Sequence, residues 1–334
     1  MSMKRNIRTC RSVLACLFLI LTCMSVFTVQ AEEKVFCAAY GDSIAKGYSG
    51  RKKEDLRSYP ELLADEVSGK TGIPSECVKH ARNGLDSRRL NSEILSTDEA
   101  AKDMERADII TLTIGANDLM IELKEAAQEV LGTERRFVSA YDAMDTLMEG
   151  VEGNPLLIMR ILDVLNNWDY HTFEEQWVAA MRTFAQYRKD TSQMIVTNIY
   201  NPVGMFELPG TINEILEDII LNMNEIMYRY AQEYDYHVID LFTSDICDYL
   251  QDDGLHPDQE GQGIIAALAE KKIDTGRFMG KPEKEIQKET APQRTGRRRF
   301  SLFTILGPGP IAAVAAAAML AGMTVWWRVR RKRA

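Results

Sequence analysis

The fold of this chain is constrained most by its apolar segments of strand length, some of which are followed by a glycine and polar residues. Residues 35–40 run into Gly-Asp-Ser at 41–43, and the β-branched run at 107–114 is followed by Gly-Ala-Asn-Asp at 115–118. Apolar runs without alternation suit strands that are buried on both faces of a parallel sheet. A serine that follows such a strand lies at the carboxyl edge of the sheet, where open α/β sheets bind ligands.

Two further segments, 193–200 and 237–242, have the same character, and regions with a helical pattern separate the predicted strands. We expect helices to begin at Tyr59, near Ile212 and near Gly263. Strands that alternate with helices are typical of βαβ units. The sequence therefore predicts an α/β fold built on a parallel sheet.

The composition is that of a globular protein, with 46% hydrophobic and 27% charged residues among 334. Once the two ends are set aside, this length suits one domain of ordinary to large size. All 49 acidic residues lie between Glu32 and Glu289, whereas both ends of the chain are basic. Because an acidic surface repels phosphate backbones, we expect no nucleic-acid partner.

Residues 1–31 have the order of a secretory signal peptide. Basic residues at 4–11 precede an apolar run at 12–29, and Val-Gln-Ala at 29–31 offers small residues for cleavage. A basic region, an apolar region and a small-residue site in this order direct a protein to export. An uncleaved anchor helix is the alternative interpretation.

Residues 303–327 are predicted to form a transmembrane helix. The part from Pro310 to Trp327 carries no charge, and basic clusters at 297–299 and 328–334 flank the segment. A helix needs about 20 apolar residues to cross a bilayer, and tryptophan at its end suits the membrane interface. A helix buried in a globular core is the alternative, which the basic flanks disfavour.

Residues 276–302 are polar, charged and interrupted by proline, so we expect a linker between a domain at 32–275 and the membrane. With an export signal in front, residues 328–334 form a basic cytoplasmic tail. We therefore expect a single-pass protein of the cell membrane with its domain outside, in a Gram-positive bacterium. Covalent sorting to the cell wall is the alternative, although its Leu-Pro-x-Thr-Gly signal has only an imperfect match at 292–296.

Three cysteines remain beyond the predicted signal peptide, namely Cys37, Cys77 and Cys247. An odd number at wide spacing forms neither a disulfide framework nor a zinc-ligand cluster. Free cysteine behaves as a small hydrophobic residue, so we expect the three to be unpaired and mostly buried. Pairing of two of them remains open.

His256 has the surroundings of a general base. It follows Asp253 by three residues, with Gly254 between them. This spacing lets the carboxylate hold the imidazole Nδ1–H, which leaves Nε2 as the base. Asp-x-x-His is a frequent pattern, and a loop that leads into a helix is the alternative.

Four short blocks stand in one order along the chain. They are Gly-Asp-Ser at 41–43, Gly84 within the region 76–90, Gly-Ala-Asn-Asp at 115–118 and Asp-Gly-Leu-His-Pro at 253–257. With these blocks the chain, over roughly residues 34–272, resembles the GDSL or SGNH family of serine hydrolases. The resemblance implies a three-layer, flavodoxin-like fold in which a five-stranded parallel sheet lies between helices and carries the site at its carboxyl edge.

The resemblance also implies roles for individual residues. Ser43 is the implied nucleophile, His256 the general base and Asp253 the residue that orients His256. The implied oxyanion hole consists of the backbone N–H groups of Ser43 and Gly84 and the side-chain amide of Asn117. These roles make physical sense, because a hydroxyl nucleophile needs a base within reach and donors must face the developing negative charge.

The blocks depart from the family pattern in small ways. Isoleucine follows Ser43, and in the second block Asn83 competes with Gly84 for the turn. Asp42 and Asp118 also belong to the blocks. We expect these two carboxyl groups to support the scaffold through hydrogen bonds and to take no part in the chemistry.

The stretch 119–192 is longer than a crossover between neighbouring strands needs, and it is mostly helix-forming. One interpretation is an enlarged helical crossover that packs on the sheet. The other is a cap over Ser43 that shapes the acyl pocket, since functional loops grow on this edge of the sheet.

The sequence thus predicts an extracytoplasmic hydrolase of carboxylic esters, acyl or acetyl, that works through an acyl-Ser43 intermediate without metal or cofactor. We expect a small-molecule, lipid or glycan ester as substrate, a preference for short acyl chains, and a monomeric catalytic domain. Two alternatives remain. One is an O-acyltransferase on glycans that uses the same residues, and the other is a binding domain that retains the fold but performs no chemistry.

Overall fold

The apolar runs of the sequence form the strands of a parallel sheet. In the computed structural model, which describes residues 34–51, 53–202 and 210–279, five strands pair in the order β2-β1-β3-β4-β5. They are β1 (Val35–Gly41), β2 (Ser75–Ala81), β3 (Ile109–Thr113), β4 (Gln193–Thr197) and β5 (His237–Ile239). Strands β1, β3 and β4 are buried along their whole length, whereas the edge strand β2 is partly exposed. The predicted five-stranded parallel sheet is confirmed.

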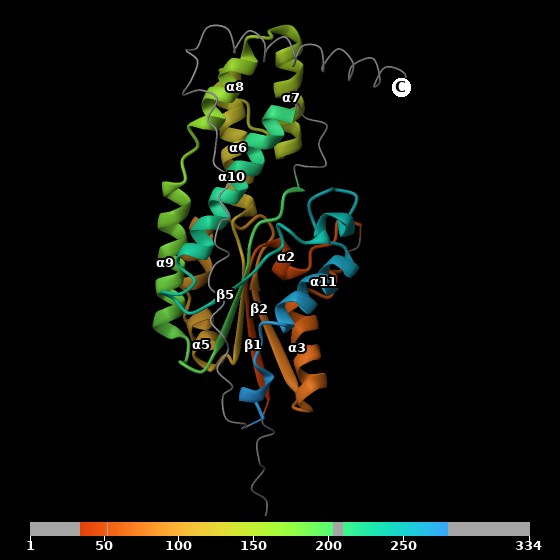
Figure 1. Cartoon of the computed structure of the whole chain (residues 1–334), viewed down its shortest axis with the longest axis vertical. Coiled ribbons are helices and arrows are strands. Elements are labelled where there is room, and N and C mark those ends of the chain that lie inside the picture. Colours follow the sequence, from red (N-terminus) through yellow and green to blue (C-terminus); the bar gives the residue numbers. More distant parts are fainter. Residues whose placement is uncertain (1–33, 52, 203–209, 280–334) are drawn as a thin grey trace, which may run out of the picture. The chain divides into compact units, whose positions relative to one another are not determined.

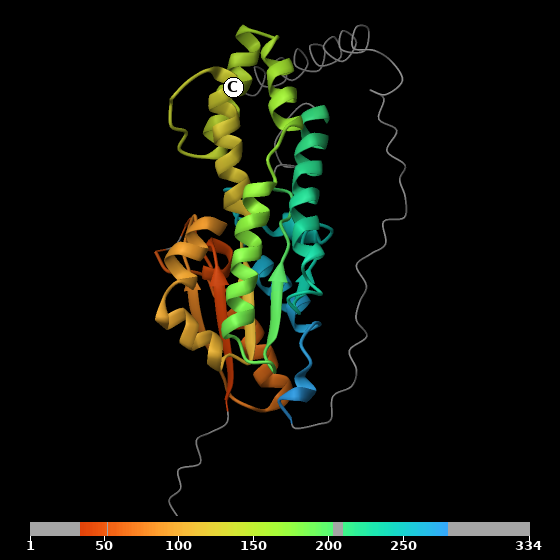
Figure 2. The same ribbon diagram turned by 90° about the vertical axis from the view of Figure 1, so that its left-hand side faces the viewer.

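Helices cover both faces of the sheet (Figures 1 and 2). Helices α3 (Tyr59–Thr71) and α11 (Gln259–Glu270) contribute to one hydrophobic core, and α5 (Asp98–Arg106), α9 (His171–Tyr187) and α10 (Gly210–Arg229) to the other. Successive residues of β1 alternate between the two cores, as the pleat of a strand requires. Cys37 belongs to the core under α3, and Ala38 to the core under α9. The chain therefore has the three layers that were predicted.

The stretch 119–192 has two structural parts. Helices α6 (Ala116–Leu131), α7 (Ala140–Gly153) and α8 (Leu157–Asn166) lie beyond the carboxyl ends of the strands, whereas α9 returns along the sheet (Figure 1). The C-terminal ends of α6 and α7 lie together, because a Cβ on Gly150 would come within 2.9 Å of the Leu131 side chain. Buried residues of all four helices belong to one hydrophobic core with residues of β1 and β3.

Strands β4 and β5 each end three residues earlier than the apolar runs predict. Asn198 explains both ends. Its backbone N–H still donates to the Ile239 carbonyl at 3.0 Å, but its side-chain Oδ1 accepts from the N–H groups of Leu241 at 2.6 Å and Phe242 at 3.1 Å. A side chain thus takes the place of the next backbone partner, and residues 198–202 leave the sheet.

Helix α11 starts earlier than predicted, at Gln259 instead of near Gly263. Asp258 is the cause, because its Oδ1 accepts from the N–H groups of Glu260 and Gly261, both at 2.9 Å. An aspartate at this position satisfies N–H groups that have no partner within the helix. The remaining short helices are α2 (Ser43–Lys46), α4 (Ser87–Arg89), η1 (Leu90–Leu95), η3 (Asp245–Tyr249) and η4 (Thr275–Arg277).

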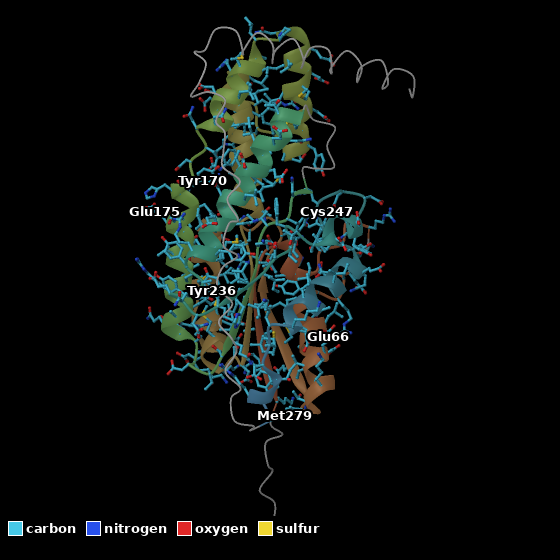
Figure 3. All side chains as sticks on the ribbon, in the orientation of Figure 1. Glu66, Tyr170, Glu175, Tyr236, Cys247 and Met279 are labelled. Atoms are coloured by element: carbon cyan, nitrogen blue, oxygen red, sulfur yellow. The ribbon has the colours of Figure 1, made fainter. Side chains whose placement is uncertain are left out.

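Cys37, Cys77 and Cys247 are free, as predicted, but only Cys37 of the three has the burial that was predicted for most of them. Cys37 is buried, and Cys77 and Cys247 are partly exposed (Cys247 is labelled in Figure 3).

Contacts within the chain separate Met1–Lys34 from Val35–Ala334, and all the elements above belong to the second unit. Within the residues that the structure describes, no helix has both the length and the apolar character that a bilayer crossing needs. The predicted signal peptide at 1–31, transmembrane helix at 303–327 and tail at 328–334 lie outside the described residues, as does most of the linker at 276–302. These assignments stay predictions.

Candidate active site

Ser43 is the first residue of α2, directly beyond the end of β1. The turn depends on Gly41, whose φ of +137° disfavours other residues and where a Cβ would lie 2.1 Å from the Thr113 carbonyl oxygen. Glycine therefore lets the ends of β1 and β3 approach each other. Asp42 then caps α2, because its Oδ1 accepts from the Ile44 N–H at 2.9 Å.

Ser43, His256 and Asp253 form one hydrogen-bonded chain. The Ser43 Oγ lies 2.8 Å from Nε2 of His256, and Nδ1 of His256 lies 2.7 Å from Oδ2 of Asp253. The other carboxylate oxygen, Oδ1, accepts from the backbone N–H groups of Leu255 and His256, each at 3.0 Å. The structure thus brings together three residues that the sequence places in two distant blocks.

The charge of Asp253 determines the direction of these hydrogen bonds. Desolvation raises the pKa of Asp253, but bonds from the N–H groups of His256 and Leu255 and from the imidazole outweigh it and hold the pKa below its usual value. An ionised carboxylate can only accept, so Nδ1 of His256 carries the proton. Nε2 is then the acceptor that faces Ser43.

Asn117 lies in the first turn of α6, beyond the end of β3. Its Nδ2 donates to the Leu85 carbonyl at 3.0 Å, and it lines the same cavity as Ser43. The amide nitrogen has two N–H groups, and the bond to Leu85 uses one of them. The bond orients the amide and leaves a second donor.

Gly84 lies in the turn after β2, with a φ of +70°. Glycine rather than Asn83 thus takes the left-handed position of this turn, which favours a residue without Cβ. The Arg82 N–H donates to the Gly41 carbonyl at 3.0 Å, which ties the turn to the end of β1. Gly84 itself is not one of the described residues that line the cavity.

Asp42 and Asp118 have the scaffold contacts that were predicted. The Asp118 carboxylate accepts from the backbone N–H of Ser87 at 3.0 Å and from its hydroxyl. Burial raises the pKa of Asp42 to about 7 and that of Asp118 to about 6, against the bonds that each carboxylate accepts. The buried carboxyl group of Asp42, next to Ser43, therefore changes from its charged to its neutral form as the pH falls through about 7.

A cavity of about 80 Å³ opens beside the Ser43 hydroxyl. Asp42, Ser43, Asn117, Asn198 and His256 are among its polar residues. Most of its remaining lining is apolar and comes from the ends of β3 and β4, the start of α6 and the His256 turn. These residues are Ile114, Ala116, Met120, Ile199, Pro202 and Leu255.

Three tyrosines around the His256 turn escape the sequence patterns. The Tyr48 ring packs on the imidazole of His256 with ring centroids 4.6 Å apart. The hydroxyl of Tyr141 donates to the Asp253 carbonyl at 2.7 Å, and the hydroxyl of Tyr200 donates to the Leu255 carbonyl. The sequence carries no signal for Tyr48 or Tyr141. The Asn-Pro pair at 201–202 is the one sign that the loop around Tyr200 lies at the functional edge.

Among the residues that the structure describes, no group of three or more His, Cys, Asp and Glu side chains is arranged to hold a metal ion.

The chain is similar to one curated protein and to several solved structures. It is 25% identical to the uncharacterized protein YpmR of Bacillus subtilis strain 168 over 273 residues, which cover 76% of this chain and 92% of that protein. Similar solved structures include the lipase Lip_vut3 from a goat rumen metagenome, with 16% identity, 74% and 97% of the two chains covered and a TM-score of 0.47. An extracellular lipase from Streptomyces rimosus has 14% identity, 72% and 100% coverage and a TM-score of 0.48.

The sequence pattern of one protein family matches this chain over residues 39–264. The match includes all four blocks and the residues that the structure gathers around Ser43. The chain belongs to the GDSL-like lipase/acylhydrolase family.

Proposed function

We propose that this protein hydrolyses carboxylic esters through an acyl intermediate on Ser43. The observation that carries the proposal is the hydrogen-bonded chain from the Ser43 Oγ through the His256 imidazole to the Asp253 carboxylate, with distances of 2.8 and 2.7 Å. A hydroxyl becomes an effective nucleophile near neutral pH when a base within hydrogen-bond reach accepts its proton.

In the first half of the reaction, Nε2 of His256 accepts the proton of Ser43 while Oγ bonds to the ester carbonyl carbon. Asp253 stabilises the imidazolium that results. The imidazolium then gives its proton to the leaving alcohol as the carbon–oxygen bond breaks. In the second half, water gives a proton to His256 as its oxygen bonds to the acyl carbon. The imidazolium then returns that proton to the Ser43 Oγ as the bond between Oγ and the acyl carbon breaks and the carboxylic acid leaves.

Negative charge develops on the carbonyl oxygen in both halves. We assign its stabilisation to the backbone N–H groups of Ser43 and Gly84 and to the second N–H of the Asn117 amide. The position of Asn117 in the cavity of Ser43, with its amide oriented by Leu85, supports its assignment. The assignment of Gly84 rests on its place in the second block and on the hydrogen bond that joins its turn to the end of β1.

The apolar lining of the cavity suits the acyl side of an ester. Since one water-sized group occupies about 10–15 Å³, a cavity of about 80 Å³ holds several such groups, which favours a short acyl chain. The start of α6 contributes Met120 and Asn117 to this cavity. Met120 is thus the residue of the 119–192 stretch that we assign to the acyl pocket, and none of the described lining residues comes from α7 or α8.

The proposal includes a location. The pattern of residues 1–31 supports export, and that of 303–334 supports an anchor in the membrane with the domain outside. An ester on a small molecule, lipid or glycan at the cell surface is then the substrate, and the catalytic domain acts as a monomer.

The test is hydrolysis of a chain-length series of p-nitrophenyl esters by the full-length chain, alongside its Ser43→Ala variant. We expect ester hydrolysis that favours short acyl chains and is lost in the variant, together with labelling of Ser43 by a fluorophosphonate. A wild-type protein that neither hydrolyses esters nor takes up the label would be a binding domain. Faster transfer of the acyl group to an added sugar hydroxyl than to water would favour the acyltransferase.

A further inference from the structure

The turn from Asp253 to His256 carries two of the three residues of the hydrogen-bonded chain. Within the turn, the side-chain Oδ1 of Asp253 accepts from the N–H groups of Leu255 and His256. The carbonyl groups of the turn are held from outside, because the Asp253 carbonyl accepts from Tyr141 and the Leu255 carbonyl accepts from Tyr200. Two phenol groups from different parts of the chain thus restrain the turn that presents His256.

Tyr141 comes from an unexpected element. It is the second residue of α7, one of the helices beyond the sheet edge, 112 positions before Asp253. Tyr200, by contrast, comes from the loop after β4 and lies next to the cavity itself. Through Tyr141, the helices of the 119–192 stretch therefore contact Asp253 directly, the residue that orients His256.

The start of α7 is itself well fixed. Ser139 caps the helix by accepting from the Asp142 N–H at 3.1 Å, and the Asp142 carboxylate pairs with Arg135 at 2.7 Å and accepts from the Val138 N–H at 3.0 Å. Tyr141 lies between these capping residues. Its hydroxyl is consequently presented by a fixed backbone and not by a free loop.

The chemistry of the phenol suits this role. Partial burial and the neighbouring Asp253 raise the pKa of Tyr141, so its hydroxyl keeps its proton and donates at neutral pH. A donor on the Asp253 carbonyl limits rotation of the peptide unit that joins Asp253 to Gly254. Gly254, with a φ of +64°, is the pivot at which the turn would otherwise relax.

We propose that Tyr141 is a positioning residue, which holds the Asp253–His256 turn so that Nε2 of His256 stays within hydrogen-bond reach of the Ser43 hydroxyl. The inference rests on the proposed hydrolysis at Ser43. Reactions between fixed groups lose rate steeply when the groups are displaced. Since one intramolecular hydrogen bond is worth about 0.5–1.5 kcal/mol net, removal of the hydroxyl lowers kcat about 2- to 12-fold and leaves KM unchanged.

The test compares full-length wild type, Tyr141→Phe and Tyr230→Phe. Tyr230 is the matched control, because its hydroxyl donates to Glu174 at the same 2.7 Å and neither of these two residues lines the cavity. Each protein is assayed for kcat and KM on a short p-nitrophenyl ester and for the rate of fluorophosphonate labelling. Assays run at a temperature at which circular dichroism shows all three proteins folded, so that lost stability cannot imitate lost positioning.

We expect Tyr141→Phe to lower kcat and the labelling rate by the same factor without a change in KM, and Tyr230→Phe to match the wild type. The labelling rate matters because it depends on Ser43 and His256 but not on an ester substrate. Wild-type values of both kcat and the labelling rate in Tyr141→Phe, or a rise in KM alone, would overturn the inference. A wild-type protein without activity or labelling would instead overturn the proposed function.

Discussion

The hydroxyl oxygen of Ser43 lies 2.8 Å from Nε2 of His256, although the two residues are 213 positions apart in the chain. Glutamine side chains on the His256 side help to join the two segments. Gln251 accepts from the Gly50 N–H at 2.9 Å and donates to the Tyr48 carbonyl at 2.8 Å. The side-chain amide bonds the backbone as another peptide group would, which holds the segment after Ser43 against the His256 turn.

Gln262 and Gln259 repeat this arrangement with different burial. Gln262 is buried, accepting from the Tyr59 N–H at 2.7 Å and donating to the Ile44 carbonyl at 3.2 Å. Gln259 is exposed and makes both bonds with the backbone of Arg57, at 3.1 and 3.0 Å.

We expect Gln262→Met to lower the free energy of unfolding by about 2–4 kcal/mol, because it leaves buried groups without partners. Water replaces the lost bonds in Gln259→Met, so its cost stays below about 1 kcal/mol. Urea unfolding measures both, and equal losses would contradict the role of burial.

Asp42 makes stability depend on pH. Its pKa of about 7 in the folded protein lies above the usual value of 3.8, so the folded state holds a proton that the unfolded chain has released. The contribution of Asp42 to stability is therefore full below about pH 4 and is lost as the pH rises to 7, by an amount on the order of 1–4 kcal/mol. Asp42→Asn keeps an Oδ1 acceptor for Ile44 and should flatten this fall.

The measurement is urea unfolding of wild type and Asp42→Asn at pH 5 and pH 8. The variant keeps part of the pH dependence, because burial also raises the pKa of Asp118, to about 6. An unchanged difference between the two pH values in Asp42→Asn would show that Asp42 is ionised in the folded protein throughout this range.

Asn117→Ala should lower kcat about 10²- to 10³-fold with little change in KM, since it removes a donor from the developing oxyanion. Asn91→Ala is the matched control. The Asn91 amide also donates to a backbone carbonyl, that of Gln176 at 2.9 Å, but it does not line the cavity. Steady-state kinetics on a short ester measures kcat and KM for both variants. A similar kcat for Asn117→Ala and Asn91→Ala would remove Asn117 from the oxyanion hole.

Met120 should limit the length of the acyl group. A tryptophan at this position fills part of the cavity, so Met120→Trp should lower kcat/KM for longer p-nitrophenyl esters relative to the acetate. Each methylene excluded costs about 0.8 kcal/mol, or about fourfold. Met159→Trp, at an exposed position of α8, is the control. A chain-length profile that Met120→Trp leaves unchanged would place the acyl group elsewhere.

Much of the fold follows from local patterns. The runs that became β1 and β3 are apolar or β-branched, as suits strands buried on both faces. The type of sheet and the position of Ser43 and Asn117 at its edge were therefore predictable. The ends of β4 and β5 were not. Both strands end where the Asn198 side chain accepts from the N–H groups of Leu241 and Phe242. A side chain that replaces a backbone partner more than 40 positions away leaves no periodic pattern in the sequence.

Local patterns were sufficient to predict the α/β class, the residue types of the site and their order along the chain, because burial and turn chemistry act on neighbouring residues. They could not predict the distance from Ser43 to His256, the cavity that Met120 lines or the contact of Tyr141 with the Asp253 carbonyl. Each of these depends on how segments far apart in the chain pack against one another. Packing at the level of single hydrogen bonds is a property of the whole fold, which no local pattern encodes.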